Sequence, residues 1–493
     1  MHCTILHMKK KLTPPQKTIL QKIRNAITAN PFSRQRLLAD CAISELPPTA
    51  SNKKILLAAK SKAEEMGREF MPKQKTVAAH YDDNTCRLID GLFLFITFHR
   101  YLNQLDLHIK AQEKQDTPLP LSCAKEMLRD LEKFGYSTQE SARHIAIFFQ
   151  MRRAFYFINT TLPGDCPCMK ALRCRLWNNI FTHDTGLYVD LLWNRMEDFS
   201  TILEGETGTG KGVAAAAIGR SGYIPFDLKT HRFKESFTRA FLEINLSQIP
   251  EQLIESELFG HTRGAFTGAT ADHAGIFARS SRYGAVFLDE IGELSPHIQV
   301  KLLKILQERI FTPVGGTKTQ KFSGRVIAAT NRDISQLRQQ GKFRDDFYYR
   351  LCSDTITIPP LHTRLRENQE ELCLLTVHLL ERITGKKSVK LKEKVLAALN
   401  ASLQTTYRWP GNIRELEQSI RRILLSGQYI PDTKKQGNDQ MELSQALEQE
   451  RLTITDLTRR YCDQLYSRHG TYQEVARITG LDRRTVKKYL DKE

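Results

Sequence analysis

A glycine-rich segment with a single lysine follows a short apolar run near the middle of the chain. The run Phe199–Leu203 precedes it and an alanine-rich, helix-like segment follows; the segment itself reads Gly205, Glu206, Thr207, Gly208, Thr209, Gly210, Lys211, Gly212. Glycines let consecutive backbone N–H groups close on phosphate oxygens, and a helix N-terminus adds the positive end of its dipole. The lysine ammonium reaches the β- and γ-phosphates, so this order of strand, loop and helix predicts an ATP-binding loop.

Two adjacent carboxylates follow a second apolar run. Ala285–Leu288 reads as a buried strand and ends in Asp289 and Glu290. Behind a phosphate-binding loop, this pattern predicts that Asp289 holds Mg²⁺ and that Glu290 polarises the attacking water. The pair could also simply cap a helix. Phosphate-binding loops usually place Ser or Thr after the lysine to hold magnesium, and Gly212 stands there, so Asp289 is the main protein ligand expected for Mg²⁺.

A third segment lies between these two motifs and is bounded by glycines. It reads Gly264, Ala265, Phe266, Thr267, Gly268, Ala269. The small residues leave one bulky apolar side chain and one hydroxyl to present, which predicts a flexible hairpin tip that pushes Phe266 into a partner. An ordinary glycine-rich surface loop is the alternative.

These six residues match the signature of the sigma-54-dependent transcription activators, the bacterial enhancer-binding proteins, and Glu255–His261 resembles the same family. The resemblance covers roughly residues 165–430 and recurs at the C-terminus. It implies an AAA+ α/β core with a helical lid, and it implies that the Gly264–Ala269 loop contacts sigma-54. Family members commonly carry Glu after the loop lysine, so Gly212 does not argue against membership.

The resemblance also assigns three polar residues at strand ends. Asn245 matches the residue that holds the catalytic glutamate until the complex is assembled. Thr330 and Asn331 are the polar end of the short apolar strand expected at Arg325–Asn331, and they match the sensor I residues that read the γ-phosphate.

Arginines supply the remaining expected contacts. Phe343–Leu351 resembles the arginine-finger segment, with Arg344 the first candidate and Arg350 the second, although two arginines six residues apart could simply face solvent. Phosphate charge in the transition state favours a planar cation from a neighbouring subunit. Arg414, after the turn that begins at Trp409, matches the lid residue that touches nucleotide.

The C-terminus carries a pattern typical of a Fis-like helix-turn-helix. Thr471 and Glu474 have the spacing of a capping box, Gly480 falls at the turn, and Asp482 can cap a last helix. Leu457, Tyr461 and Leu465 are expected to form the apolar face of the helix before them. In the last helix Val486, Tyr489 and Leu490 are expected inside, and the DNA-contacting candidates are Arg483, Arg484, Thr485, Lys487, Lys488.

Bulk properties agree with a nucleic-acid partner. The 493 residues suffice for about three domains, and the net charge of +18 favours a polyanion. The ten cysteines are read as reduced thiols, and Cys166, Cys168 and Cys174 lack a clear fourth ligand for zinc. Leu92–Phe98, the longest apolar run, is too short for a bilayer, which needs about 18–20 residues, and no signal peptide is evident. We therefore expect no membrane partner and a cytoplasmic location.

The expected organisation is a helical regulatory module (1–164), an AAA+ core (165–362), a helical lid (363–430), a linker (431–440) and a helix-turn-helix (441–493). Residues 222–240 read as a surface extension of the core. The family implies a DNA-bound homo-oligomer, from dimer to hexameric ring, that uses ATP and Mg²⁺ to open the sigma-54 RNA polymerase complex. Two rivals are an AAA+ protein remodeller with a DNA-binding tail, disfavoured by Gly264–Ala269, and a repressor with an inactive ATPase, disfavoured by Lys211, Asp289, Glu290 and Arg344.

Overall fold

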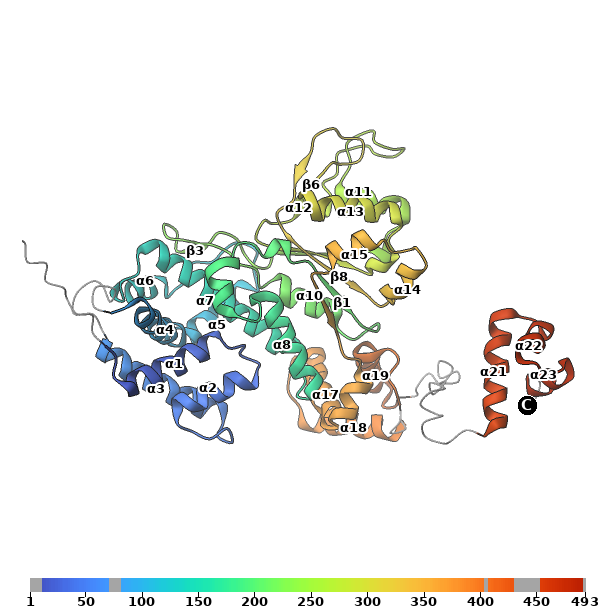
Figure 1. The fold of residues 1–493 in the computed structure, drawn as a ribbon, viewed down its shortest axis with the longest axis horizontal. Helices are drawn as coiled ribbons and strands as arrows, with labels where there is room; N and C mark the ends of the chain where they lie inside the picture. The colour runs from blue at the N-terminus through green and yellow to red at the C-terminus, as the bar shows by residue number, and fades with distance from the viewer. Residues whose placement is uncertain (1–10, 71–80, 403–406, 430–452, 491–493) are drawn as a thin grey trace, which may run out of the picture. The chain divides into compact units, whose positions relative to one another are not determined.

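The computed structural model describes residues 11–70, 81–402, 407–429 and 453–490, and the expected linker 431–440 lies outside them. The chain forms two compact units, Met1–Tyr429 and Ile430–Glu493. Within the larger unit, Figure 1 shows a helical bundle, a sheet with helices on both faces, and a small helical lid. Among the residues described, no helix has the length and apolar composition that crossing a membrane requires.

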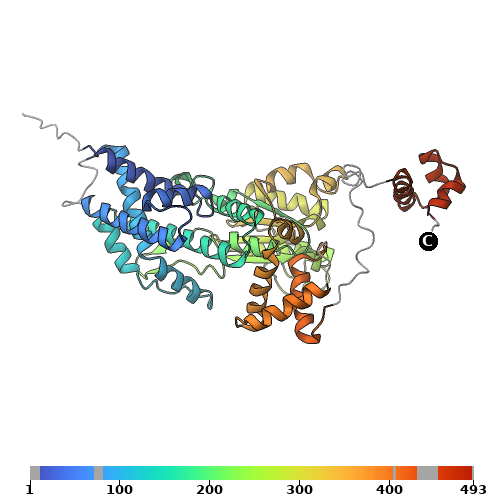
Figure 2. The ribbon, with the colours of Figure 1, turned by 90° about the horizontal axis from the view of Figure 1, so that it is seen from below.

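A run of helices opens the larger unit, as expected for the helical module. Capping boxes begin two of them, Thr13 with Gln16 and Ser137 with Glu140, and satisfy backbone N–H groups that a helix start leaves free. Figure 2 shows the bundle at one end of this unit. The helices are α1 (Pro14–Thr28), α2 (Arg34–Ser44), α3 (Asn52–Phe70), α4 (Asp83–Arg100), α5 (Leu102–Gln112), α6 (Ala124–Lys133), α7 (Thr138–Thr161), α8 (Pro167–Phe181) and the single turn α9 (Thr185–Leu187).

A parallel sheet of five strands in the order β4-β5-β8-β1-β9 forms the centre of the core. Its register aligns polar residues at the carboxyl ends, because Asn245 pairs with Asp289 and Glu204 pairs with Thr330. The first strand begins two residues later than the expected Phe199, after a 3-10 turn at Met196–Asp198. The strands are β1 (Thr201–Glu204), β4 (Phe241–Asn245), β5 (Ala285–Asp289), β8 (Arg325–Thr330) and β9 (Asp354–Thr357).

Alternate residues of the buried strands pack into two separate cores. On one face, Ile327 and Ala329 of β8 join α10 (Lys211–Gly219), α7 and α8 in one hydrophobic cluster. On the other face, Val326 and Ala328 pack against a second group of helices. That group and its neighbours are α11 (Glu251–Phe259), α12 (Ile276–Arg279), α13 (Pro296–Glu308), β6 (Ile310–Phe311), β7 (Gln320–Lys321), α14 (Ile334–Gln339) and α15 (Asp345–Leu351).

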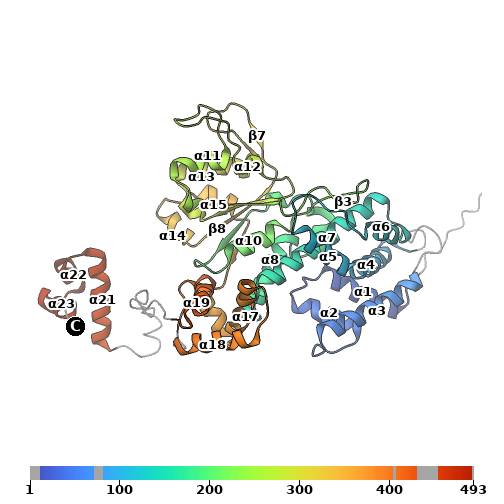
Figure 3. The ribbon, with the colours of Figure 1, turned by 180° about the vertical axis from the view of Figure 1, so that it is seen from behind.

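The N-terminal helices therefore share a core with the ATPase-like sheet. Helix α7 packs directly against α10, the helix that follows the glycine-rich loop (Figure 3). The insertion at residues 222–240, between α10 and β4, is not the surface extension that the sequence suggests. Its hairpin, β2 (Phe226–Asp227) and β3 (Arg232–Phe233), places Phe233 and Phe237 at 4% and 1% exposure among the side chains of α7.

A helical lid follows the sheet. Its helices are α16 (Leu361–Glu367), α17 (Glu370–Thr384), α18 (Val389–Ser402) and α19 (Asn412–Ser426). Leu379, Leu399 and Leu416 are buried in their common core, and Trp409 packs with them.

In the smaller unit, residues 453–490 form three helices, α21 (Ile454–His469), α22 (Tyr472–Thr479) and α23 (Arg483–Leu490). Its core contains Cys462 and Leu465, whereas Tyr461 is 44% exposed, so the expected face through Tyr461 is wrong. Four-residue steps drift around a helix with 3.6 residues per turn, and the packed face runs through the next position instead.

Candidate nucleotide site

The glycine-rich loop joins β1 to α10, as the sequence predicts. Gly208 has φ +81°, and a Cβ there would lie 2.3 Å from the carbonyl oxygen of Gly411 in the lid, so only glycine fits. Lys211 is 7% exposed, and its Nζ donates to the carbonyls of Gly205 at 2.8 Å and Glu206 at 3.2 Å. Burial lowers the pKa of Lys211, and the carboxylates beyond the loop oppose that shift. The ammonium is thus held inside the loop that it is expected to serve.

The carboxyl end of β5 faces this lysine. Burial raises the pKa of Asp289, and the charge of Lys211 opposes the shift. Asn245 donates from Nδ2 to Oδ2 of Asp289 at 3.1 Å, whereas the family assignment expects it to hold Glu290. Glu290 has φ +57° and accepts instead from the backbone N–H of Asn331 at 3.2 Å. The two carboxylates therefore have separate hydrogen-bond partners.

Asn331 connects the end of β8 to the glycine-rich loop, because its Nδ2 donates to the Thr207 hydroxyl at 3.0 Å. Thr330 is fully buried, and its Oγ1 accepts from the backbone N–H of Arg332 at 3.0 Å. Of the two residues expected to read the γ-phosphate, Asn331 is the one bonded to the loop.

The lid reaches the loop through a residue that the sequence motifs did not single out. Asn412 is fully buried, and its Nδ2 donates to Glu206 at 2.9 Å and to the Thr207 carbonyl at 3.1 Å. Its Oδ1 accepts from the backbone N–H of Leu361 at 2.7 Å, so one amide joins loop, hinge and lid. The sequence offered one indication of this role, because Asn412 directly precedes Ile413 and Arg414 in the lid motif. The positive charge of Arg414 adds to the lowering of the pKa of Lys211, and it opposes the rise that burial causes in the pKa of Asp289.

Magnesium has oxygen donors here that suit a hard cation. Gly212 offers none, and the Thr209 hydroxyl donates to the Glu206 carbonyl at 2.8 Å. Glu290 and Asp289 both lie near Lys211, and hard divalent cations prefer carboxylate oxygen. The residues present therefore fit magnesium held by Asp289 together with the phosphates.

The two candidate finger arginines lie away from their own chain's loop. Arg344 caps α15 and forms an ion pair with Asp346 at 2.8 Å, with 44% of its side chain exposed. Arg350 donates from Nε to the Leu306 carbonyl at 3.0 Å. Neither hydrogen bond involves the glycine-rich loop.

The Gly264–Ala269 segment forms a tight turn on the far side of α11 from the lid, at the top of Figure 1. Gly264 and Gly268 have φ of +81° and +100°, which other residues rarely adopt. The Gly264 N–H donates to the Ala269 carbonyl at 2.8 Å and closes the turn, and Phe266 remains 39% exposed. The turn thus presents an apolar side chain to solvent, as the sequence predicts.

Two protein-family models match the segments that form the sheet and the lid. Residues 192–357 match the Sigma-54 interaction domain model, and residues 366–433 match an AAA+ ATPase lid domain model. This chain therefore contains a Sigma-54 interaction domain followed by an AAA+ lid domain. Regulatory protein AtoC of Escherichia coli (strain K12) is 37% identical over 252 residues, which cover 50% of this chain and 50% of AtoC. NtrC of Azospirillum brasilense is 41% identical over 226 residues, covering 46% of this chain and 43% of NtrC.

The chain thus spans about half the length of the curated relatives that it matches. Among solved structures, NtrX from Brucella abortus in complex with ATP aligns with a TM-score of 0.42 at 19% identity, covering 75% of this chain and 80% of that chain.

The sigma-54 interaction domain is tied to the N-terminal helices just behind its glycine-rich loop. Arg153 of α7 is fully buried and donates to the carbonyls of Arg220 at 2.9 Å and Gly222 at 2.7 Å, at the end of α10. Gln150, one turn earlier, donates to the Ser221 carbonyl at 3.0 Å. Burial lowers the pKa of Arg153 to about 9, so the contact costs desolvation.

The small C-terminal unit presents its basic residues on α23. Asp482 caps this helix, as predicted, by accepting from the backbone N–H groups of Arg484 at 2.8 Å and Thr485 at 3.0 Å. Only half of the expected capping box at α22 forms, since Glu474 pairs with Arg477 rather than with the backbone of Thr471. Val486 is buried; the four exposed basic side chains are Arg483, Arg484, Lys487, Lys488.

Proposed function

We propose that this protein binds DNA upstream of promoters, assembles into a homo-oligomeric ring of hexamer type, and hydrolyses ATP to convert the closed complex of sigma-54 RNA polymerase holoenzyme into an open one. Its place of action would be the cytoplasm. The observation that carries the proposal is the exposed Phe266 on a glycine-bounded turn of a domain that also holds the glycine-rich loop with Lys211. Neither a plain DNA-binding protein nor a general ATPase needs both the exposed Phe266 turn and a phosphate-binding loop.

The chemistry is attack of water on the γ-phosphate. Backbone N–H groups of Gly205–Gly212 and the ammonium of Lys211 would hold the phosphates, and Glu290 would accept a hydrogen bond from the water and polarise it. Asp289 would hold Mg²⁺, which supplies charge neutralisation when bound. The protein forms no covalent intermediate, so its contribution is positioning and electrostatics.

Asn331 and Asn245 would adjust these carboxylates. The Asn331 backbone N–H bonds Glu290 while its side chain bonds Thr207, so a phosphate that displaces the Thr207 contact would alter how Glu290 is held. Asn245 would orient Asp289 through its 3.1 Å bond, in place of the glutamate contact expected from the family. Thr330 supports the strand end, and Arg414 adds positive charge on the lid side.

Arg344 would act on the nucleotide of a neighbouring subunit, with Arg350 as the second candidate. Its guanidinium is 44% exposed, and among the described residues it bonds Asp346 at the start of the same helix. Solvent screens an exposed ion pair of this kind, so Arg344 can readily exchange Asp346 for a phosphate. Arg344 bonds Asp346 rather than the glycine-rich loop of its own chain. In an assembled ring it would instead contact the nucleotide bound by the neighbouring subunit.

The Gly264–Ala269 turn would engage sigma-54. A second loop supports it, because the Thr262 N–H donates to the Val314 carbonyl at 3.0 Å and the Val314 N–H donates to the Gly260 carbonyl at 2.9 Å. The base of the turn is therefore fixed while Phe266 and Thr267 remain accessible. An exposed aromatic residue on a fixed base is suited to inserting into a partner.

Helix α23 would enter the major groove. Residues near the start of a recognition helix contact base edges, which favours Arg483, Arg484 and Thr485, and later residues fall near phosphate, which favours Lys487 and Lys488. The Asp482 cap fixes the start of the helix. The net charge of +18 supports the same partner.

The N-terminal helices would regulate the ATPase through α7. This helix bonds the end of α10 through Gln150 and Arg153. From the insertion, Phe233 stacks on Phe149 of α7, and Phe237 packs edge-on against Phe157 of α7. A shift of α7 would therefore move the helix that carries Lys211. The insertion at residues 222–240 would thus help to couple the N-terminal helices to the nucleotide site.

An open-complex assay with purified sigma-54 polymerase tests the proposed function. Phe266→Ala should retain ATPase activity and DNA binding and lose open-complex formation, because only the contact with sigma-54 is removed. Glu290→Gln should lose both ATPase activity and open complexes. If Phe266→Ala opens promoters as well as the unmodified protein, the remodelling role is wrong, and a general remodelling ATPase with a DNA-binding tail becomes the better description.

A further inference from the structure

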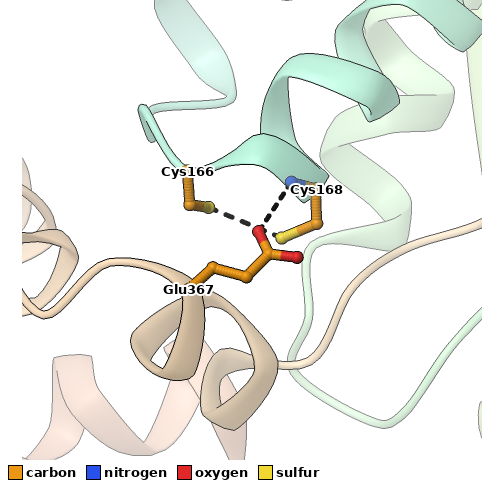
Figure 4. A group of neighbouring side chains, drawn as sticks. All are labelled: Cys166, Cys168 and Glu367. Atoms are coloured by element: carbon orange, nitrogen blue, oxygen red, sulfur yellow. Dashed lines mark hydrogen bonds between the residues drawn. The ribbon is translucent and has the colours of Figure 1, made fainter.

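Three metal-ligating side chains meet where the lid joins helix α8. Cys166 is the N-cap residue of α8, Cys168 lies in its first turn, and Glu367 is the last residue of lid helix α16. Figure 4 shows the two thiols and the carboxylate pointing toward one another. The ligand atoms all lie within 4.8 Å of one another, and none belongs to the nucleotide site. Cys174, which the sequence grouped with the two thiols, is not a member.

The spacing is close to what a tetrahedral cation requires. With Zn–S bonds of about 2.3 Å and Zn–O bonds of about 2.0–2.2 Å, tetrahedral angles separate two sulfurs by about 3.8 Å and a sulfur from an oxygen by about 3.6 Å. The Sγ atoms of Cys166 and Cys168 are 3.5 Å apart, so they need to move by only a few tenths of an ångström. Thermal motion of side chains covers such a distance.

The ligands are held in place before any cation binds. Cys166 is fully buried and its backbone is extended, and Pro167 fixes the first residue of the helix. The Glu367 carboxylate accepts from the backbone N–H of Cys168 at 2.7 Å, which brings it to the thiols from 199 residues away. Two anchored thiols and an anchored carboxylate lose little entropy on binding.

A buried ion pair beside the cluster keeps the two elements together. Arg364 of α16 bonds Glu371 of α17, and these side chains are 4% and 0% exposed. Arg364 also donates to the Pro163 carbonyl at 2.6 Å, and Glu371 accepts from the Asp165 N–H at 3.1 Å. The segment before Cys166 is therefore attached to the lid independently of the thiols.

We propose that Cys166, Cys168 and Glu367 bind a thiophilic divalent cation of the Zn²⁺ class, with water as the fourth ligand. Thiolate ligands select zinc-like ions over magnesium or calcium, which separates this site from the one at Asp289. Three protein ligands with one open position give an exchangeable ion rather than a closed structural site. The bound cation would link the start of α8 to the end of α16 and so restrain the lid.

Cobalt titration of the full-length reduced protein tests the site. After chelation and removal of the chelator, Co²⁺ should bind with one equivalent producing thiolate charge-transfer bands and tetrahedral d–d bands, and Zn²⁺ should abolish them. Cys166→Ser and Cys168→Ser should lose the bands, and Glu367→Gln should weaken binding by about tenfold or more. Cys174→Ser, on the same helix and outside the cluster, is the matched control and should behave like the unmodified protein.

Two results would overturn the proposal. One is an absence of charge-transfer bands in the reduced protein; the other is bands that persist in both Cys166→Ser and Cys168→Ser. Hydrogen exchange gives a second readout that needs neither ATP nor polymerase. Zn²⁺ should slow exchange in residues 361–367 of the unmodified protein and of Cys174→Ser, and should leave Cys168→Ser unchanged. Equal slowing in all three proteins would mean that zinc acts elsewhere.

Discussion

Asn412 offers the sharpest test of how the lid is attached to the glycine-rich loop. Its amide bonds the loop through Nδ2 and the hinge through Oδ1, and the residue is fully buried. Its φ is +52°, a left-handed conformation that Asn and Gly tolerate better than Ala. Asn412→Gly removes the hydrogen bonds and keeps the conformation accessible, whereas Asn412→Ala removes the bonds and adds strain.

The expected loss follows from the three bonds. A buried N–H of Leu361 left without a partner costs about 1–3 kcal/mol, and the two bonds from Nδ2 contribute about 2 kcal/mol or more, since one acceptor is a carboxylate. Asn412→Gly should therefore weaken lid docking by about 3–5 kcal/mol. Asn412→Ala should lose about 1 kcal/mol more through backbone strain.

Native-state hydrogen exchange measures this loss directly. The Leu361 N–H bonds Asn412, and the Ile413 N–H bonds the Gly208 carbonyl at 3.0 Å, so both amides report on the docked lid. A loss of about 3 kcal/mol corresponds to roughly 10²-fold faster exchange. Asn412→Asp is the matched variant, because it keeps an acceptor for Leu361 and loses the donor for the loop, so it should expose Ile413 more than Leu361.

Exchange at Ile413 within about threefold of the unmodified protein in Asn412→Gly would refute the reasoning. So would equal exchange at Leu361 in the Asp and Gly variants, because the hinge bond would then contribute nothing. ATP affinity should fall with lid docking in each variant.

Further variants separate the roles assigned to single side chains. Glu290→Gln should bind ATP normally and stop turnover, and normal hydrolysis would show that another group polarises the water. Arg344→Ala should keep ATP affinity and lose roughly 10³-fold or more in hydrolysis; mixing it with Glu290→Gln subunits should restore activity only if the finger acts across an interface. In DNA titrations over several salt concentrations, Arg484→Ala should weaken specific sites by about 1–3 kcal/mol, whereas Lys488→Ala should weaken all DNA and lower the salt slope by about one; equal loss on specific and scrambled DNA for Arg484→Ala would exclude base reading. Burial lowers the pKa of His144 from 6.5 to about 4, so the unfolded chain binds a proton that the folded chain excludes, and stability should fall by up to about 3 kcal/mol as pH drops through that window; chemical denaturation of His144→Gln should show a flatter pH profile.

The sequence by itself determined the local chemical motifs. The glycine-rich loop, the paired carboxylates after β5 and the turn at Phe266 each depend on neighbouring residues whose backbone requirements are visible in one short segment. Glycines at positive φ, a lysine at a helix start and acidic residues at a strand end are, in that order, typical of a nucleotide site. The same holds for the Asp482 cap of α23, because a cap and its helix are adjacent in sequence.

Only the tertiary structure decided the long-range partners. The strand register places Asn245 beside Asp289, so Asn245 bonds Asp289 rather than Glu290. The packing of the lid places Asn412 against the glycine-rich loop, which is distant in sequence. The insertion at residues 222–240 is expected to be a surface extension, yet Phe233 and Phe237 are buried because they pack against apolar side chains of α7. The contact between Glu367 and the backbone N–H of Cys168 likewise depends on how the lid packs against α8. Contacts of this kind depend on which distant surfaces pack together, and hydrophobic burial, which is non-directional, leaves no mark of the partner in the sequence of either surface.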